Sequence, residues 1–170
     1  MIELLILYEL TKKVLTMYGI SKEIHQQFSV LTTPSYGTIK PALVRLEKDS
    51  CVKTQKSISS GGRPSVFYSI TPRGKEVLSE LLLSPLQDNP IQFLTTARIR
   101  VSCADVLEKQ EQKRLFKLIK IKCESIKYDI KKLIDETSSQ YNKKLVFDNL
   151  MCEYNNFILL LEGLDRACGS

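Results

Sequence analysis

The chain has 170 residues, a hydrophobic content of 43% and a formal net charge of +6. This length can form one domain or two small ones with a real core, and the composition is ordinary for a soluble globular protein. The longest apolar runs are too short to span a bilayer, and the first residues carry no secretory signal. We therefore expect a cytoplasmic protein without a membrane partner, whose basic excess mildly favours an acidic partner such as nucleic acid.

The chemistry-bearing residues argue against an enzyme. The chain has a single histidine, His25, and five cysteines without C-x-x-C spacing. It shows no glycine-rich phosphate loop and no nucleophile elbow. The sequence therefore predicts no catalytic site, no metal site and no cofactor. Cys123 and Cys152 fall on apolar helical faces and are expected to be buried free thiols, whereas Cys51 and Cys168 are expected to be more exposed. A thiol-based redox switch stays open.

Two helices are expected at the start of the chain. The first runs roughly from Ile2 to Thr16 and is rich in leucine and isoleucine. Gly19 then interrupts the chain, and Ser21 is a suitable N-cap for a second helix that carries Ile24 and Phe28.

A third helix is expected within "PSYGTIKPALVRLEKDSCV", residues 34–52, and ends near Asp49. Its apolar face consists of Ile39, Leu43 and Leu46. Pro41 lies inside it, although an interior proline costs a helix about 3 kcal/mol. One interpretation is a helix whose first turn is kept polar for contacts with a ligand. The alternative is that Pro41 marks the true start of the helix and that residues 35–40 form a loop.

Two strands and a fourth helix follow. "CVKTQKSIS" alternates as a strand does, "SGGRPS" is a turn, and "VFYSI" is rich in β-branched and aromatic residues. In the next segment Thr71 is a good N-cap, and Pro72 stands at the first helical position. The order helix, helix, helix, strand, turn, strand, helix is that of a winged helix-turn-helix. The predicted fold class is mainly α with a small β-hairpin wing.

Two motifs resemble the DNA-binding domain of PadR-type transcriptional regulators. The first is "SYGTIKPALVRLEKDS", from Ser35 to Ser50, and the second is "GGRPSVFYSITPRGKEVL", residues 61–78. Lys40 stands where the family has a tyrosine, and Ser50 stands where it has the glycine that closes the helix. If that helix end requires a positive φ, a serine carries a steric cost there that glycine would not.

The resemblance implies double-stranded DNA as a partner, with the third helix entering the major groove. The expected contacts are Lys22, Ser35, Tyr36, Gly37, Thr38, Lys40 and Arg63. The polar residues would bind phosphates or base edges, Gly37 would let the backbone approach closely, and Arg63 at the wing tip would enter the minor groove. For Lys22 a solvated side chain is an open alternative. The roles of Arg45 and Arg73 stay open, and Tyr68 is expected to pack in the core or the wing.

The expected domains are a winged domain at 1–83, a connector at 84–92 and a helical domain at 93–170. In the helical domain apolar residues recur at alternating steps of three and four from Phe116 to Thr137 and again from Phe147 to Leu164. Such seams predict a homodimer interface, the alternative being a monomeric helical hairpin. The expected dimerisation residues are Ile119, Ile126, Ile130, Leu133, Leu150, Phe157 and Leu161.

The sequence and its resemblance together predict a homodimeric transcriptional regulator, a repressor rather than an activator, which binds an inverted repeat. The resemblance also implies a small-molecule effector, and the aromatic side chains offered for its pocket are Phe93, Tyr154 and Phe157. Core packing is the favoured interpretation of these aromatics. The main rival function is a winged-helix module that binds proteins and not DNA.

Overall fold

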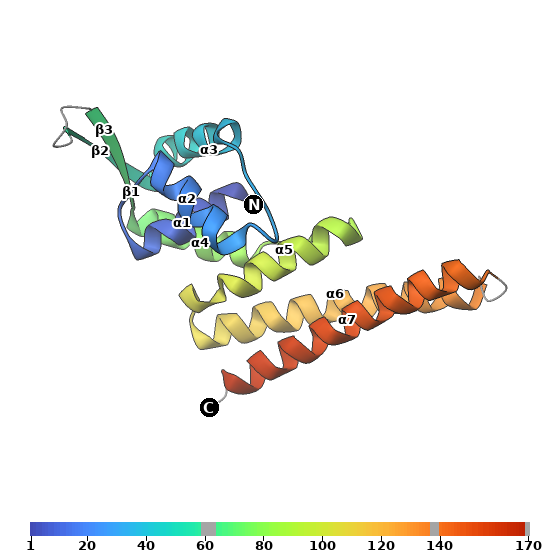
Figure 1. Cartoon of the computed structure of the whole chain (residues 1–170). Helices are drawn as coiled ribbons and strands as arrows, with labels where there is room; N and C mark the ends of the chain where they lie inside the picture. Colours follow the sequence, from blue (N-terminus) through green and yellow to red (C-terminus); the bar gives the residue numbers. More distant parts are fainter. Residues whose placement is uncertain (59–63, 137–139, 169–170) are drawn as a thin grey trace. The chain divides into compact units, whose positions relative to one another are not determined.

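The computed structural model describes residues 1–58, 64–136 and 140–168, and Figure 1 labels its helices and strands. The chain divides into two compact units. The first comprises Met1–Ser84 and Arg98–Val106, and the second comprises Pro85–Ala97 and Leu107–Ser170. Among the described residues, no helix combines the length and the hydropathy that a membrane crossing requires. The functional domains expected at 1–83 and 93–170 stay a prediction.

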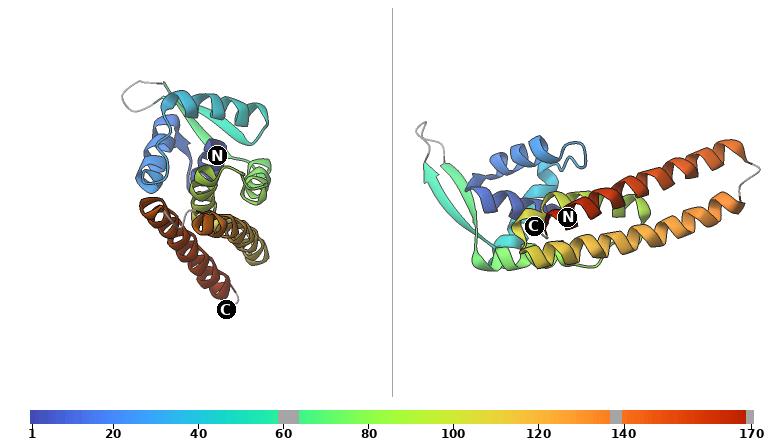
Figure 2. Two further views of the ribbon diagram at one scale, coloured as in Figure 1. Left: turned by 90° about the vertical axis from the view of Figure 1, so that its right-hand side faces the viewer. Right: turned by 90° about the horizontal axis from the view of Figure 1, so that it is seen from below.

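The first unit is a winged helix-turn-helix, which confirms the predicted fold class. Its elements are α1 (Ile2–Lys12), β1 (Leu15–Thr16), α2 (Met17–Phe28), α3 (Tyr36–Lys48), β2 (Val52–Ile58), β3 (Pro64–Ile70) and α4 (Pro72–Leu83). The strands form a three-stranded antiparallel sheet in the order β1-β3-β2. Figure 2 shows the β2–β3 ribbon reaching past the helices of this unit, as a wing does.

Helix α1 is the centre of the first unit. Its side chains are buried all around the helix, at Leu4, Leu5, Ile6, Leu7, Tyr8, Glu9 and Leu10. A helix that is buried on every side must be surrounded by other elements, and α1 contacts α2, α3, α4 and β3. Tyr8 packs edge-on against Phe28 of α2, with the ring centroids 6.1 Å apart. The other elements of the unit are therefore arranged around α1.

The junction between α1 and α2 corrects two predictions. The first helix ends at Lys12 and not at Thr16, because Leu15 and Thr16 form β1 and pair with β3. The second helix begins at Met17 with Thr16 as its N-cap, and the Thr16 hydroxyl accepts a hydrogen bond from the backbone N–H of Gly19 at 3.1 Å. Gly19 therefore lies in the first turn of α2 and does not break the chain, and Ser21 is not the cap.

Hydrogen bonds join Thr71, at the start of α4, to backbone carbonyls of the segment that follows α3. Thr71 is the N-cap of α4, as predicted, and its hydroxyl accepts from the backbone N–H of Gly74 at 3.0 Å. The same hydroxyl donates to the carbonyl of Ser50 at 2.7 Å, and the backbone N–H of Thr71 donates to the carbonyl of Cys51 at 3.0 Å. Ser50 has a φ of 57°, the left-handed conformation that favours glycine. A glycine at this position would therefore fit this backbone with less strain.

The second unit contains the first part of α5 (Pro90–Ser102), α6 (Lys109–Glu136) and α7 (Tyr141–Ala167), while η1 (Ala104–Val106) belongs to the first unit. Helices α6 and α7 run side by side as an antiparallel hairpin (Figures 1 and 2). Helix α5 begins inside the stretch that was expected to be a connector. The predicted seam of α6 is buried from Phe116 to Ile130, whereas Leu133 is exposed and Thr137 lies outside the described residues.

Candidate nucleic-acid interface

Helix α3 has one buried face and one exposed face. The buried face consists of Ile39, Ala42, Leu43 and Leu46. Their spacing of three and four residues places them on one side of the helix, against the core of the first unit. The helix begins at Tyr36 with Ser35 as its N-cap, so the alternative start at Pro41 is wrong. The polar residues ahead of Pro41 therefore belong to the first helical turns.

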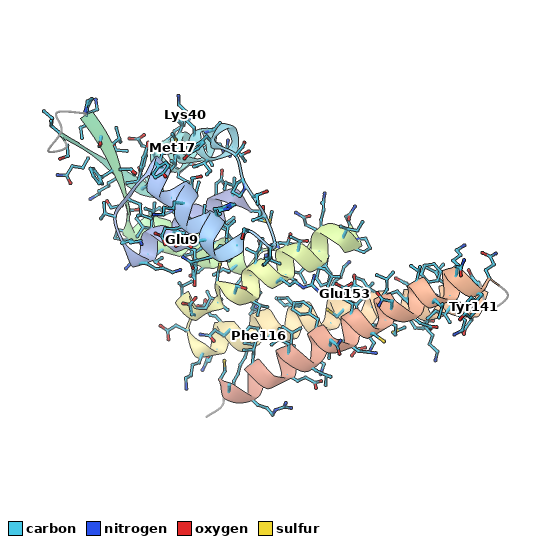
Figure 3. The ribbon with its side chains drawn as sticks, viewed as in Figure 1. Glu9, Met17, Lys40, Phe116, Tyr141 and Glu153 are labelled. Atoms are coloured by element: carbon cyan, nitrogen blue, oxygen red, sulfur yellow. The ribbon has the colours of Figure 1, made fainter. Side chains whose placement is uncertain are left out.

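The structure brings together most of the residues predicted to contact DNA. Ser35, Tyr36, Gly37, Thr38 and Lys40 are all exposed and lie in or just before the first turns of α3. Figure 3 labels Lys40, whose side chain stands on the outer side of α3. The hydroxyls of Ser35 and Thr38 lie 3.2 Å apart and hydrogen-bond to each other. Lys22 is exposed on α2, the preceding helix of the helix-turn-helix.

The start of α3 presents backbone donors to the outside. The backbone N–H of Thr38 donates to the carbonyl of Ser35 at 3.0 Å, but the Ser35 side chain makes no capping bond. The N–H groups of Tyr36 and Gly37, in the first turn, have no partner within the helix. The partial positive charge of a helix start favours an anion such as a phosphate oxygen. Pro41 carries no N–H, so the carbonyl of Gly37 cannot accept the usual bond from a residue four positions on. The first turn of α3 therefore has backbone N–H donors and one carbonyl acceptor, that of Gly37, without their usual helical partners.

Gly37 is not required by the packing of the chain itself. A Cβ placed on Gly37 would meet only the Ser35 hydroxyl, at 3.5 Å, which is an ordinary contact. The packing of the chain therefore does not explain why a glycine stands at this position. The close approach of the α3 backbone to DNA stays a prediction.

Sequence reasoning missed Val44 and Lys48 on the same exposed face. They follow Lys40 at steps of four, which places the three side chains in one row along the helix. Val44 is 59% exposed, which is unusual for a valine on a helix with a well-made core face. An apolar side chain in this row can contact a thymine methyl group in the major groove. The spacing from Lys40 was the signal that could have identified both residues.

The arginines whose roles were open form ion pairs. The guanidinium of Arg45 lies 2.7 Å from the carboxylate of Glu3, which connects α3 to α1. Arg73 pairs with Glu76 at 3.1 Å and with Glu80 at 3.2 Å on α4. Arg63, predicted at the wing tip, lies outside the described residues.

Tyr68 on β3 is half-buried, and burial raises the pKa of its hydroxyl, with a further contribution from Glu47. This placement fits the expected packing role. Lys53 and Lys56 are exposed on β2 and add positive charge beside α3 within the same unit.

The residues predicted for dimerisation are mostly buried within one chain. Ile119, Ile126, Ile130, Phe157 and Leu161 are buried, because the seams of α6 and α7 pack against each other. Leu150 is half-buried and Leu133 is exposed. The aromatics suggested for an effector pocket, Phe93, Tyr154 and Phe157, are also buried. Both assignments stay predictions.

The cysteines differ from expectation at two positions. Cys51, expected to be more exposed, is buried directly before β2, and burial raises the pKa of its thiol. Cys152, expected to be buried, is exposed on α7. Cys123 is buried as predicted. Within the described ranges, no group of three or more histidine, cysteine or carboxylate side chains is arranged to hold a metal ion.

Comparisons with known proteins place the first unit in context. The model of the Transcriptional regulator PadR-like family matches residues 6–80, and no curated protein matches the chain. A PadR family transcription regulator from Clostridium difficile R20291 is 33% identical, over 45% of this chain and 78% of that chain, with a TM-score of 0.41.

Two structures of Bacillus subtilis PadR also match along nearly the whole chain. The complex with operator DNA is 18% identical over 98% of both chains, with a TM-score of 0.48. The complex with p-coumaric acid is 17% identical over 99% of this chain and 95% of that chain, with a TM-score of 0.43. Since these TM-scores lie below 0.5, the family assignment depends on the sequence match.

Proposed function

The chain belongs to the PadR-like family of transcriptional regulators, and from this premise we propose that it binds a specific DNA sequence as a homodimer and represses transcription there. The observation that carries the proposal is the exposed face of α3. Polar and basic side chains gather on it, while the opposite face is fully buried in the first unit.

The proposed contacts divide into two kinds. Lys22, Lys40 and Lys48 supply positive charge to the phosphate backbone, which gives affinity that falls with salt. Tyr36, Thr38 and Val44, which are exposed on α3, are proposed to contact base edges, which would give sequence preference. Arg63 at the wing tip is proposed to add a minor-groove contact.

A dimer is supported by the apolar side chains that the hairpin leaves exposed. They include Ile121, Tyr128, Leu133, Leu145, Val146, Leu159 and Leu160 on α6 and α7. The seams already bury each other, so this second apolar surface is the part available to a second copy. Two winged units joined in this way would bind the two half-sites of an inverted repeat. A response to a small-molecule effector is proposed from family membership alone.

The test is selection of bound duplexes from a random DNA pool with the full chain, followed by affinity measurements at several salt concentrations. We expect a palindromic sequence whose affinity falls steeply with salt. Lys40→Gln should reduce the slope of log affinity against log salt by about one. Lys143→Gln is the matched control, because Lys143 is an exposed lysine on α7 outside the first unit.

Gly37→Ala separates recognition from folding. The free chain has space for the added methyl group, so its free energy of unfolding should change little, apart from a gain in helix propensity of up to about 1 kcal/mol. The affinity for the selected duplex should fall by about tenfold or more, because the methyl group stands between α3 and the DNA. A folded dimer that enriches no duplex, or that binds without salt dependence, would contradict the proposal and favour a protein partner.

A further inference from the structure

A cleft lies between α6 and α7 in the second unit. Its residues are distant in the sequence from those of the proposed DNA-binding face. Its volume is about 310 Å³, which is at the lower end of the range for small-molecule sites, about 300–1,000 Å³. Its lining residues are Lys113, Arg114, Phe116, Lys117, Lys120, Leu161, Glu162 and Asp165. Figure 3 labels Phe116 in this part of the hairpin. The cleft combines an apolar floor with charged walls.

The floor and the walls come from different faces of the helices. Phe116 and Leu161 belong to the packed seams and are almost completely buried. The cations Lys113, Arg114, Lys117 and Lys120 all belong to α6, and the carboxylates Glu162 and Asp165 belong to α7. Four positive and two negative groups give the cleft a net charge of +2. This net charge favours an anionic ligand.

One cation of the cleft is already neutralised and the others are not. Lys120 and Glu162 form an ion pair that raises the pKa of Lys120 and lowers that of Glu162, so both stay charged. Lys113, Arg114 and Lys117 have no acidic partner among the residues that the structure describes. Lys113 and Lys117 are also four positions apart on one helix face, where like charges repel each other. A doubly charged anion would relieve this repulsion.

We propose that this cleft binds a phosphate monoester with a small apolar or aromatic body. The phosphate carries a charge of about −1.5 to −2 at pH 7 and would lie against Lys113, Arg114 and Lys117. The planar guanidinium of Arg114 can bind two phosphate oxygens at once. The apolar body would lie over the small parts of Phe116 and Leu161 that stay exposed and against the methylene chains of the lining lysines. The size of the cleft excludes a duplex, so this site is separate from the proposed DNA contacts.

The proposal goes beyond the proposed function, because binding here requires no DNA. It is tested by calorimetric titration of the full chain with phenyl phosphate, benzoate, phenol and inorganic phosphate, without any duplex present. A failed DNA selection would therefore leave this result unaffected, and a failed titration would leave the DNA proposal unaffected.

The series separates charge from apolar contact. We expect phenyl phosphate to bind about tenfold more tightly than benzoate, because the dianion can bind several cations at once. Phenol lacks the charge and inorganic phosphate lacks the apolar body, so both should bind more weakly than phenyl phosphate. The affinity for phenyl phosphate should also fall as the pH is lowered through about 6, where the dianion takes up a proton.

Substitutions at the cleft should act in opposite directions. Lys117→Gln and Arg114→Gln should each weaken the binding of phenyl phosphate by about three- to tenfold, because each removes one charge-assisted contact. Glu162→Gln should tighten binding, because it releases Lys120 for the ligand and removes a negative charge. Lys131→Gln is the matched control, an exposed lysine on α6 that does not line the cleft.

Three outcomes would overturn the proposal. Benzoate could bind as tightly as phenyl phosphate, which would remove the argument for a dianion. Inorganic phosphate could bind as tightly as phenyl phosphate, which would show that the apolar floor contributes nothing. Lys131→Gln could weaken binding as much as Lys117→Gln, which would assign the effect to the overall charge of α6 and not to the cleft.

Discussion

The winged unit and the α6–α7 hairpin reach their structures by different means. In the winged unit single residues determine the backbone: Thr71 caps α4, Gly74 allows a close approach, and Ser50 adopts a left-handed conformation. In the hairpin a repeated apolar pattern determines the packing, and no individual backbone position carries a comparable role among its described residues. Because of this difference, we expect substitutions of the same chemical type to change the free energy of unfolding by unequal amounts in the two units.

The largest contrast is expected between two glycine-to-alanine substitutions. A Cβ on Gly74 would lie 2.1 Å from the carbonyl oxygen of Cys51, so α4 and the start of β2 would have to separate. We expect Gly74→Ala to lower the free energy of unfolding by about 3 kcal/mol or more. A Cβ on Gly163 in α7 would meet nothing within 4 Å, and Gly163→Ala should stabilise the helix by up to about 1 kcal/mol.

Urea unfolding of both variants at one protein concentration measures this contrast. Equal stability of the Gly74→Ala and Gly163→Ala variants would show that the backbone around Cys51 can move without cost. In that case the winged unit would be as tolerant as the hairpin.

The next contrast lies within the hairpin and tests the predicted dimer seam. Ile119 is 0% exposed and Leu133 is 41% exposed, although both belong to the same repeat. Ile119→Ala should lower the free energy of unfolding by about 2–5 kcal/mol, because it leaves a cavity between α6 and α7. Leu133→Ala should have a much smaller effect on the folding of one chain, about 0.5 kcal/mol or less.

Sedimentation equilibrium of the Leu133→Ala variant supplies the second half of this test. If Leu133 contacts a second copy, the substitution weakens self-association while the single chain stays folded. Unchanged self-association would remove Leu133 from the proposed interface.

A smaller effect is expected at the end of α3. Ser50 has a φ of 57°, so Ser50→Gly should stabilise the winged unit by about 0.5–1 kcal/mol. The bond from Thr71 to the Ser50 carbonyl is made to the main chain and is retained. The matched control is Ser29→Gly at the end of α2, where φ is −57° and glycine offers no relief of strain. A gain in stability from Ser29→Gly equal to that from Ser50→Gly would contradict this account.

The smallest effect concerns the buried carboxylate of Glu9, which Figure 3 labels on α1. One oxygen accepts from Gln27 at 2.9 Å and from Lys12 at 3.5 Å, and the other has no hydrogen-bond partner within the described part of the chain. Burial raises the pKa of Glu9 above its usual 4.5, while Lys12 and Gln27 oppose the shift. The carboxyl group of Glu9 therefore binds a proton more tightly in the folded chain than in the unfolded chain.

The sign of the pH dependence follows from that difference. The contribution of Glu9 to stability is greatest below a pH of 4.5 and is lost as the pH rises through the higher pKa of the folded state. The free energy of unfolding of Glu9→Gln relative to wild type should thus increase as the pH rises from about 4.5 to the pKa of Glu9 in the folded state, and it should be constant above that pKa. Chemical unfolding of both proteins across this range measures the difference, and a difference independent of pH would contradict the account.

Predictions succeeded where the signal was local and failed where it depended on a distant segment. Local signals predicted the strand β2, the cap at Thr71 and the polar first turn of α3, because each depends on neighbouring residues. The boundary between α1 and α2 was wrong, because Leu15 and Thr16 pair with residues of β3 that are distant in the sequence. Periodicity alone could not reveal that partner.

The site was predicted in part for a related reason. Its polar residues were identified by their resemblance to a family motif, and they are exposed on one helix end. Val44 was missed because a valine on an amphipathic helix normally indicates core. The buried charge of Glu9 was missed as well, since an acidic residue is seldom expected inside an apolar helix.

The bonds between α3 and α4 have a consequence for evolution. Thr71 is bonded to the carbonyls of Ser50 and Cys51, and those acceptors exist whatever side chains α3 carries. The outer row of Lys40, Val44 and Lys48 can therefore mutate without loosening the attachment of the helix. Under the proposed function, a lineage built on this frame would acquire a new operator by exchanging a few outward side chains, and the same row would be the segment to transplant when a regulator with a chosen target is engineered.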